Sequence, residues 1–232
     1  MQREEFRRIV IEEDREWHRV RRLHIQASDA AAILGDSPWR TAAELYDIKS
    51  GQKAEPDIGS KPYVVYGKRM EPLIRAEFEV DHPYFRVTYR QFDILESRAR
   101  PWQGCTLDGE LEVIADNPWG LPVGARGVLE IKTGSFRGRR DLEEWEDGIP
   151  QHYYEQVLHQ LSVTGYDFAV VVARLRRDPF RDEDNGFPEV VHRNALLKRE
   201  DVAGDIEVLN QEEADFWNRL KEGRRPAVRL SF

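Results

Sequence analysis

The sequence predicts a single α/β domain in which helices flank a mixed central β-sheet. Helical patterns dominate the first part of the chain, strand-like runs follow in the middle, and a helix at Ile149–Thr164 precedes a buried strand at Phe168–Leu175. This order of helices, strand meander, crossover helix, strand and final helix is typical of α/β proteins. With 232 residues, the chain is long enough for one domain with a substantial core. We expect residues 1–232 to form that domain, with a helical part at about 1–80 and the sheet with its helices at about 81–232.

The helical part contains clear start and end signals. Asp14–His24 has the apolar spacing of an amphipathic helix. Ser28-Asp29 then opens a short apolar helix, Ala30–Leu34, because Ser and Asp are preferred at helix starts. The capping-box pattern TAAE predicts a third helix between Thr41 and Gly51.

A longer helix is expected after a loop at residues 52–62. Val64–Val80 carries regularly spaced apolar residues, with Glu71 in its middle. Pro72 interrupts this pattern and predicts a kink or a helix boundary, because proline removes a helical hydrogen bond.

Strand signals then dominate as far as Ile131. They lie in the runs RVTYRQFDIL, TLDGELEV and GVLEIKTG, and a turn-rich loop, ADNPWGLPVGARG, separates the last two. Residues 136–149 are polar and are expected to be irregular. The remaining predicted elements are the helix Ile149–Thr164, the strand Phe168–Leu175, a turn at Asp184–Pro188, a short strand at Glu189–Arg193 and a terminal helix at Glu200–Lys221.

The composition favours a globular protein of a reducing compartment. Hydrophobic residues make up 40% of the chain and charged residues 34%, and no apolar run is long enough for a membrane helix. The first residues, MQREEFRRIV, lack the apolar stretch of a secretion signal. The single cysteine, Cys105, excludes an internal disulfide and a cysteine zinc cluster. We therefore expect a cytoplasmic protein that does not interact with membranes.

The net charge of −8 argues mildly against nucleic acid binding by the surface as a whole. An acidic protein can nevertheless present a local basic channel to DNA. Three local basic clusters could form such a channel: Arg19, Arg21 and Arg22; Lys68 and Arg69; and Arg137, Arg139 and Arg140. An ordinary solvated surface would explain each cluster equally well.

The most informative feature is the segment GVLEIKTG. Side chains alternate along a strand, so Glu130 and Lys132 project to the same face, among residues that are typical of a buried strand. Burying such charges is costly unless they pair or bind metal. A further acid, Asp108, lies in the preceding strand-and-turn segment. Two carboxylates and a lysine on adjacent strands can hold Mg²⁺ and a water that attacks a phosphate.

Each of these residues also has a simpler explanation. Glu130 and Lys132 could form an exposed ion pair, and Glu71 could pair with Arg69 or Arg75 nearby. Asp108 could simply belong to a turn, because it precedes Gly109 and Asp-Gly is a common turn dipeptide.

The helix after this strand adds a polar face. Tyr153, Gln156 and Gln160 share one side at helical spacing. Beside a metal site, such a face can orient ligands or contact the DNA backbone. A solvent-facing stripe is the alternative.

Taken together, the chain resembles the YqaJ-type viral recombinases of the lambda exonuclease family, which belong to the PD-(D/E)XK nucleases. The matching segments run in family order from about Asp14 to the end. This resemblance implies a restriction-endonuclease-like core. The segments are ASDAAAILGDSPWRTAAELYDIKSG, YGKRMEPLIRAEFE, TLDGELE, GVLEIKTG, YYEQVLHQLSVTGYDFAVVVA and EEADFWNRLKEGRRPAV.

The resemblance implies a role for each residue of the acidic cluster. Asp108, Glu130 and the backbone carbonyl of Ile131 would bind Mg²⁺, for which Mn²⁺ would substitute. Glu71 would assist a second metal or its waters. Lys132 would position or activate the attacking water.

Other residues would complete the site. Gln156 matches a family glutamine beside the metals. Ser28 and Arg40 match positions that can grip a 5′-terminal phosphate, through a helix start and bidentate pairing. Arg137 and Arg139, with Tyr153 and Gln160, are candidate DNA contacts, although the segment from Arg137 to Gly148 departs from the family pattern.

The implied function is an exonuclease that degrades one strand of duplex DNA from its 5′ end. The product would be a 3′ overhang for a single-strand-annealing partner protein, and the family implies a ring-shaped trimer. The alternatives are an endonuclease with the same site, a non-catalytic DNA-binding protein with the same fold, and a metal-stabilised domain without nucleic acid.

Overall fold

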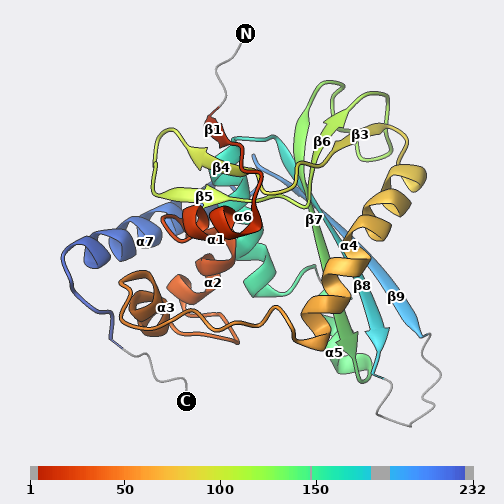
Figure 1. Cartoon of the computed structure of the whole chain (residues 1–232). Helices are drawn as coiled ribbons and strands as arrows, with labels where there is room; N and C mark the ends of the chain where they lie inside the picture. Colours follow the sequence, from red (N-terminus) through yellow and green to blue (C-terminus); the bar gives the residue numbers. More distant parts are fainter. Residues whose placement is uncertain (1–4, 147, 179–188, 228–232) are drawn as a thin grey trace.

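The computed structural model describes residues 5–146, 148–178 and 189–227, and these residues form two mixed β-sheets surrounded by helices (Figure 1). The larger sheet has the strand order β3-β6-β7-β8-β9. Within it, β7 and β8 are parallel and the other neighbours are antiparallel. The predicted α/β fold with a mixed sheet is therefore confirmed. Its strands are β3 (Phe85–Thr88), β6 (Gly109–Val113), β7 (Arg126–Phe136), β8 (Phe168–Arg177) and β9 (Val190–Lys198).

Helices cover both faces of this sheet (Figure 1). Leu129 of β7 packs with Ile74 of α4 (Pro62–Asp81) on one face. Its neighbour Val128 packs with Leu161 of α6 (Gln151–Thr164) on the other face. Alternation along β7 therefore turns the even-numbered side chains towards α6.

The centre of the sheet requires one residue without a side chain. Gly127 on β7 stands opposite Phe168 on β8. A Cβ atom at Gly127 would lie 2.3 Å from the Phe168 ring, so only glycine allows this ring to pack there.

The smaller sheet has the order β1-β4-β5-β2. Its strands are β1 (Phe6–Ile9), β2 (Ile25–Gln26), β4 (Ile94–Ser97) and β5 (Gln103–Cys105). The expected helical part at 1–80 thus also supplies two short strands. The run RVTYRQFDIL, which reads as one strand-like stretch, is divided between the two sheets as β3 and β4. Phe92 lies between them with a φ of 63°, which breaks the extended conformation.

The helix α4 continues through Pro72, which is exposed, so the helix boundary predicted there as one of two alternatives is wrong. Residues 136–149 are not irregular throughout, because α5 (Arg139–Glu146) forms within them. Leu142 and Trp145 are three residues apart and bury their side chains in the core beneath this helix.

The other predicted helices are confirmed, Ala30–Leu34 with its predicted bounds and the others with shifted ends. The first ends at Arg21 and not at His24, and the last begins at Ala203. The predicted turn at Asp184–Pro188 lies outside the described residues. The confirmed helices are α1 (Asp14–Arg21), α2 (Ala30–Leu34), α3 (Ala42–Lys49) and α7 (Ala203–Lys221). Among the described helices, none combines the length and the apolar character needed to cross a bilayer.

Candidate active site

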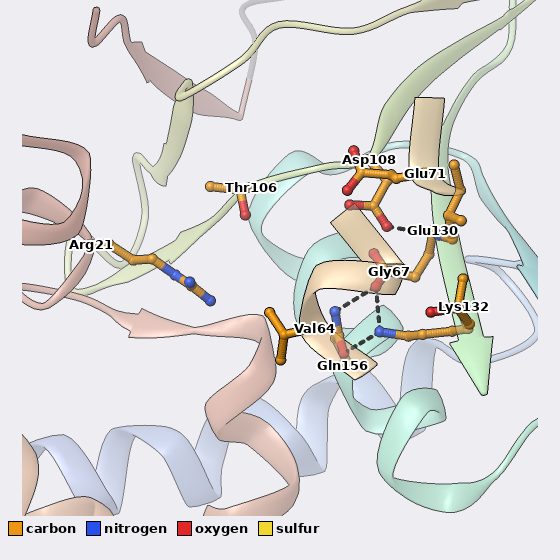
Figure 2. A pocket seen from close by; sticks show the side chains of 11 residues that line it. Arg21, Val64, Gly67, Glu71, Thr106, Asp108, Glu130, Lys132 and Gln156 are labelled. Carbon is orange, nitrogen blue, oxygen red and sulfur yellow. Dashed lines mark hydrogen bonds and ion pairs between the residues drawn. The ribbon is translucent and has the colours of Figure 1, made fainter. Parts of the chain in front are cut away.

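A pocket of about 430 Å³ lies where β7 is flanked by α4 and α6 (Figure 2). Glu71 enters it from α4 and Gln156 from α6. Asp108, the residue directly before β6, also lines it. Glu130 and Lys132 enter it from β7. The tertiary structure therefore brings together five residues from four segments that lie far apart in the sequence.

Glu130 is held by side chains on three sides. It is only 3% exposed, and Gln156 Nε2 donates to its Oε1 atom at 2.6 Å. Gln160 Nε2 donates to the other oxygen, Oε2, also at 2.6 Å. Lys132 Nζ lies 2.6 Å from Oε1. These donors satisfy both oxygens of the buried carboxylate and fix its orientation.

Asp108 is anchored by the strand that carries Glu130. Its Oδ2 atom accepts a hydrogen bond from the backbone N–H of Ile131 at 2.8 Å. Burial raises the pKa of Asp108 well above its ordinary value, and the nearby charges of Glu130 and Glu71 raise it further. The acids of this pocket therefore repel one another, and a positive charge among them would relieve that repulsion.

Glu71 forms the ion pair that the simpler explanation predicts. Arg75 Nη2, one helical turn later, lies 2.6 Å from Glu71 Oε1. Burial nevertheless raises the pKa of Glu71, against the lowering effect of Arg75, and Glu130 contributes to the increase. Glu71 thus belongs both to a helix-surface pair and to the acidic cluster.

Lys132 is kept cationic by the acids around it. Burial lowers the pKa of Lys132, but Glu130 and Asp108 outweigh that effect and raise it overall. Its Nζ atom also donates to Gln156 Oε1 at 2.8 Å and lies 4.5 Å from the centre of the Tyr153 ring. The pair of Glu130 and Lys132 is thus buried rather than exposed.

The donor set of the pocket fits a hard divalent cation. Asp108, Glu130 and the Ile131 carbonyl supply oxygen ligands, which Mg²⁺ prefers. Throughout the described part of the chain, however, no group of three or more His, Cys, Asp or Glu side chains is arranged to hold a metal. A cation here would therefore be held by two carboxylates and the backbone carbonyl, with Glu71 paired to Arg75.

The expected DNA contact by Gln160 was wrong. Gln160 is fully buried and binds Glu130, because α6 turns this side chain towards the sheet. The polar face of α6 is accordingly not a solvent-facing stripe. Tyr153 is half-buried beside Lys132, and its pKa is raised by burial, against the lowering effect of Lys132.

Ser28 and Arg40 do not line the pocket. Ser28 is exposed in a short 3-10 turn, and its Oγ accepts a hydrogen bond from Arg21 Nη2 at 3.2 Å. Asp29, expected with Ser28 at a helix start, is buried and lies 2.8 Å from Lys49 Nζ. Arg40 Nη1 lies 3.9 Å from Asp29. Arg21 links this region to the pocket, which it lines.

Arg137 and Arg139 lie away from the pocket, beyond the end of β7 and at the start of α5. Both are exposed and paired with acids one helical turn later. Arg137 Nε lies 2.9 Å from Asp141, and Arg139 Nε lies 3.7 Å from Glu143.

Several residues of the pocket were missed as site residues from the sequence. Arg21 was noted only as part of a basic cluster, whereas Thr106, Gly67 and Thr133 were not noted. Gly67 lies at a close approach of α4 to β7, because a Cβ atom there would lie 3.1 Å from Thr133 Oγ1. The pattern of glycine within a helix beside the acidic cluster was a signal of this close approach.

Sequence relatives give a consistent family. Residues 16–167 match the model of the family described as YqaJ-like viral recombinase domain. The uncharacterized protein YqaJ of Bacillus subtilis (strain 168) is 28% identical over 217 residues, which cover 92% of this chain and 58% of that protein. This chain thus spans little more than half the length of that relative.

Solved structures show a similar fold. The alkaline exonuclease LHK-Exo from Laribacter hongkongensis matches with a TM-score of 0.57 and 18% identity, over 91% of this chain and 96% of that one. Its complex with dAMP matches with the same TM-score and coverage at 19% identity. This likeness confirms the restriction-endonuclease-like fold. Because the family model covers more than half of the chain, this protein belongs to the YqaJ-like viral recombinase domain family.

Proposed function

We propose that this protein is a divalent-metal-dependent deoxyribonuclease that degrades one strand of duplex DNA from an end. The observation that carries the proposal is the arrangement of Glu130, whose carboxylate contacts Gln156, Gln160 and Lys132 in a pocket shared with Asp108. The names of the similar solved structures, an exonuclease with and without dAMP, support a nuclease that acts on DNA ends.

In this proposal, Asp108, Glu130 and the Ile131 carbonyl hold Mg²⁺, with Mn²⁺ as a substitute. The bound ion would polarise the scissile phosphate and stabilise the charge that develops on it. Lys132 positions the attacking water and donates to the phosphate oxygens. Gln156 holds the Glu130 carboxylate and the Lys132 ammonium group in position relative to each other. Glu71, on α4, assists the binding of a second metal or its waters.

Further details of the proposal come from the family. We propose 5′→3′ polarity, with Ser28 and Arg40 at the 5′-phosphate, which gives a 3′ overhang for a single-strand-annealing recombinase. We also propose a ring-shaped trimer that acts in the cytoplasm of a bacterial cell. Arg21 supports the phosphate role, since it joins Ser28 to the pocket.

The test compares linear duplex DNA bearing a 5′-phosphate with the same DNA as a closed circle, each with Mg²⁺ and with EDTA. We expect Mg²⁺-dependent loss of the linear form alone, and labels at each end then give the polarity. Cutting of the circle would indicate an endonuclease. A protein that binds DNA but cuts neither form would be a non-catalytic relative.

A further inference from the structure

Trp39 is a large aromatic residue left in solvent at a fixed position. It is 68% exposed, in the connection between α2 and α3. The Oγ atom of Ser37 accepts hydrogen bonds from the backbone N–H groups of Trp39 and Arg40, at 3.2 and 3.3 Å. The capping box of α3 begins at the next residue, Thr41. The backbone that carries the indole is therefore held at both ends.

The indole stands next to the active site. Its ring contacts His152 edge-on, with centroids 4.8 Å apart, and it is tilted against Tyr153 at 6.3 Å. Tyr153 in turn lies beneath Lys132 Nζ. One aromatic ring thus separates the exposed indole from the lysine of the acidic cluster.

The size of the pocket explains why an aromatic surface is useful here. A volume of about 430 Å³ is typical of a small-molecule site and cannot contain a duplex. A strand whose terminal nucleotide enters this pocket would leave its partner at the end of the duplex. Unpairing exposes the faces of the bases, and aromatic side chains are the usual platform for such bases.

We propose that the indole of Trp39 stacks on an unpaired nucleobase of the strand that enters the pocket. This inference rests on the proposed nuclease function and extends it to a binding position for the base. Stacking uses the π-face common to all bases, so the position accepts every nucleotide, as successive removal of nucleotides requires. Arg40, the next residue, places a cation beside the same strand.

The simplest alternative is that Trp39 only stabilises the fold. Its exposure argues against that role, because a side chain that remains in solvent buries little apolar surface. Replacement by Phe keeps an aromatic face, whereas replacement by Leu keeps apolar character without one. Val80→Ala is a matched control, because Val80 is 78% exposed at the far end of α4.

The experiment uses a 5′-phosphorylated duplex with 2-aminopurine as the terminal nucleotide, whose fluorescence decreases on stacking. Binding is measured in EDTA, so that cleavage does not compete, and KM and kcat are measured separately with Mg²⁺ on unmodified duplex. Thermal unfolding of each variant shows whether it folds.

We expect the wild type to quench the fluorescence. Trp39→Ala and Trp39→Leu should lose the quenching and raise Kd and KM about tenfold, with little change in kcat. Trp39→Phe and Val80→Ala should behave like the wild type. If the wild type cleaves DNA but Trp39→Leu keeps full quenching and an unchanged KM, the stacking role is wrong and the nuclease function stands. If the wild type neither binds nor cleaves DNA, the proposed function fails and this inference with it.

Discussion

The side-chain amide of Gln156 on α6 donates to Glu130 on β7, Nε2 to Oε1, at 2.6 Å. The same amide accepts from Lys132 Nζ through its oxygen at 2.8 Å. One glutamine therefore sets the spacing between the Glu130 carboxylate and the Lys132 ammonium group of the proposed site. Because α6 and β7 meet only through tertiary packing, this contact also couples the site to the core of the domain.

Replacing Gln156 should reduce activity without unfolding the protein. Gln156→Ala removes the contact with both charged residues, and we expect cleavage to fall about 10- to 100-fold, as for other residues that orient metal ligands. The rate of cleavage at saturating Mg²⁺ measures this effect. Gln211→Ala is the control, since Gln211 is an exposed glutamine on α7. Equal rates for the two variants would contradict the positioning role.

Lys132→Ala should abolish cleavage while the chain still folds. Glu130 would keep its hydrogen bonds from Gln156 and Gln160, so the carboxylate stays oriented. A loss of about 10²- to 10³-fold is expected when a donor to the charge that develops on the phosphate is removed. Circular dichroism and single-turnover cleavage check the two parts. Lys53→Ala, at an exposed lysine, serves as the control, and retained activity in Lys132→Ala would sink the assignment.

Mg²⁺ should stabilise the folded protein through Asp108. At about a hundredfold excess over Kd, one bound ion contributes about 2.7 kcal/mol. Asp108→Asn should remove this gain but raise the melting temperature in EDTA, because it removes one charge from the acids that repel one another. An amide oxygen can still accept from the Ile131 N–H. Melting curves with Mg²⁺ and with EDTA test both effects, and an equal Mg²⁺ shift in the variant would contradict the metal site.

Stability should decrease between mildly acidic and neutral pH because of Glu155. This residue is 1% exposed on α6, and its pKa is raised to about 7, first by burial and then by the facing Asp36, against a lowering by Gln151. A folded-state pKa above the ordinary 4.5 means that folding favours the protonated form. The stabilisation is therefore complete below about pH 4.5 and is lost as the pH rises through about 7.

Glu155→Gln should remove that dependence. The loss over this window is on the order of 3 kcal/mol at most, since one unit of pKa corresponds to about 1.4 kcal/mol. Melting temperatures at several pH values between about 5 and about 8 compare the wild type with Glu155→Gln and with Glu144→Gln, an exposed control. The same slope in all three proteins would show that Glu155 does not titrate in this range.

Local patterns in the sequence were sufficient for several parts of the fold and site. Strand alternation placed Glu130 and Lys132 on one face, which the distance of 2.6 Å between them confirms. Helical spacing placed Gln156 and Gln160 on one side of α6, and both bind Glu130. Such periodicities predict the direction of side chains correctly because they depend only on backbone geometry.

Other features depend on contacts between distant segments. The run RVTYRQFDIL has continuous strand character, but pairing assigns β3 to one sheet and β4 to the other. The helix α5 forms in a polar segment because Leu142 and Trp145 pack into the hydrophobic core. Pro72 stays within α4, where packing on the sheet outweighs the lost hydrogen bond.

The sequence by itself determined the α/β class, the chemical types of the site residues and their order along the chain. Only the tertiary structure decided that Gln160 is buried against Glu130, that Arg21 reaches the pocket and that Trp39 stands exposed beside it. The reason is physical: periodicity follows from local backbone geometry, whereas burial, pKa and proximity follow from which surfaces pack together.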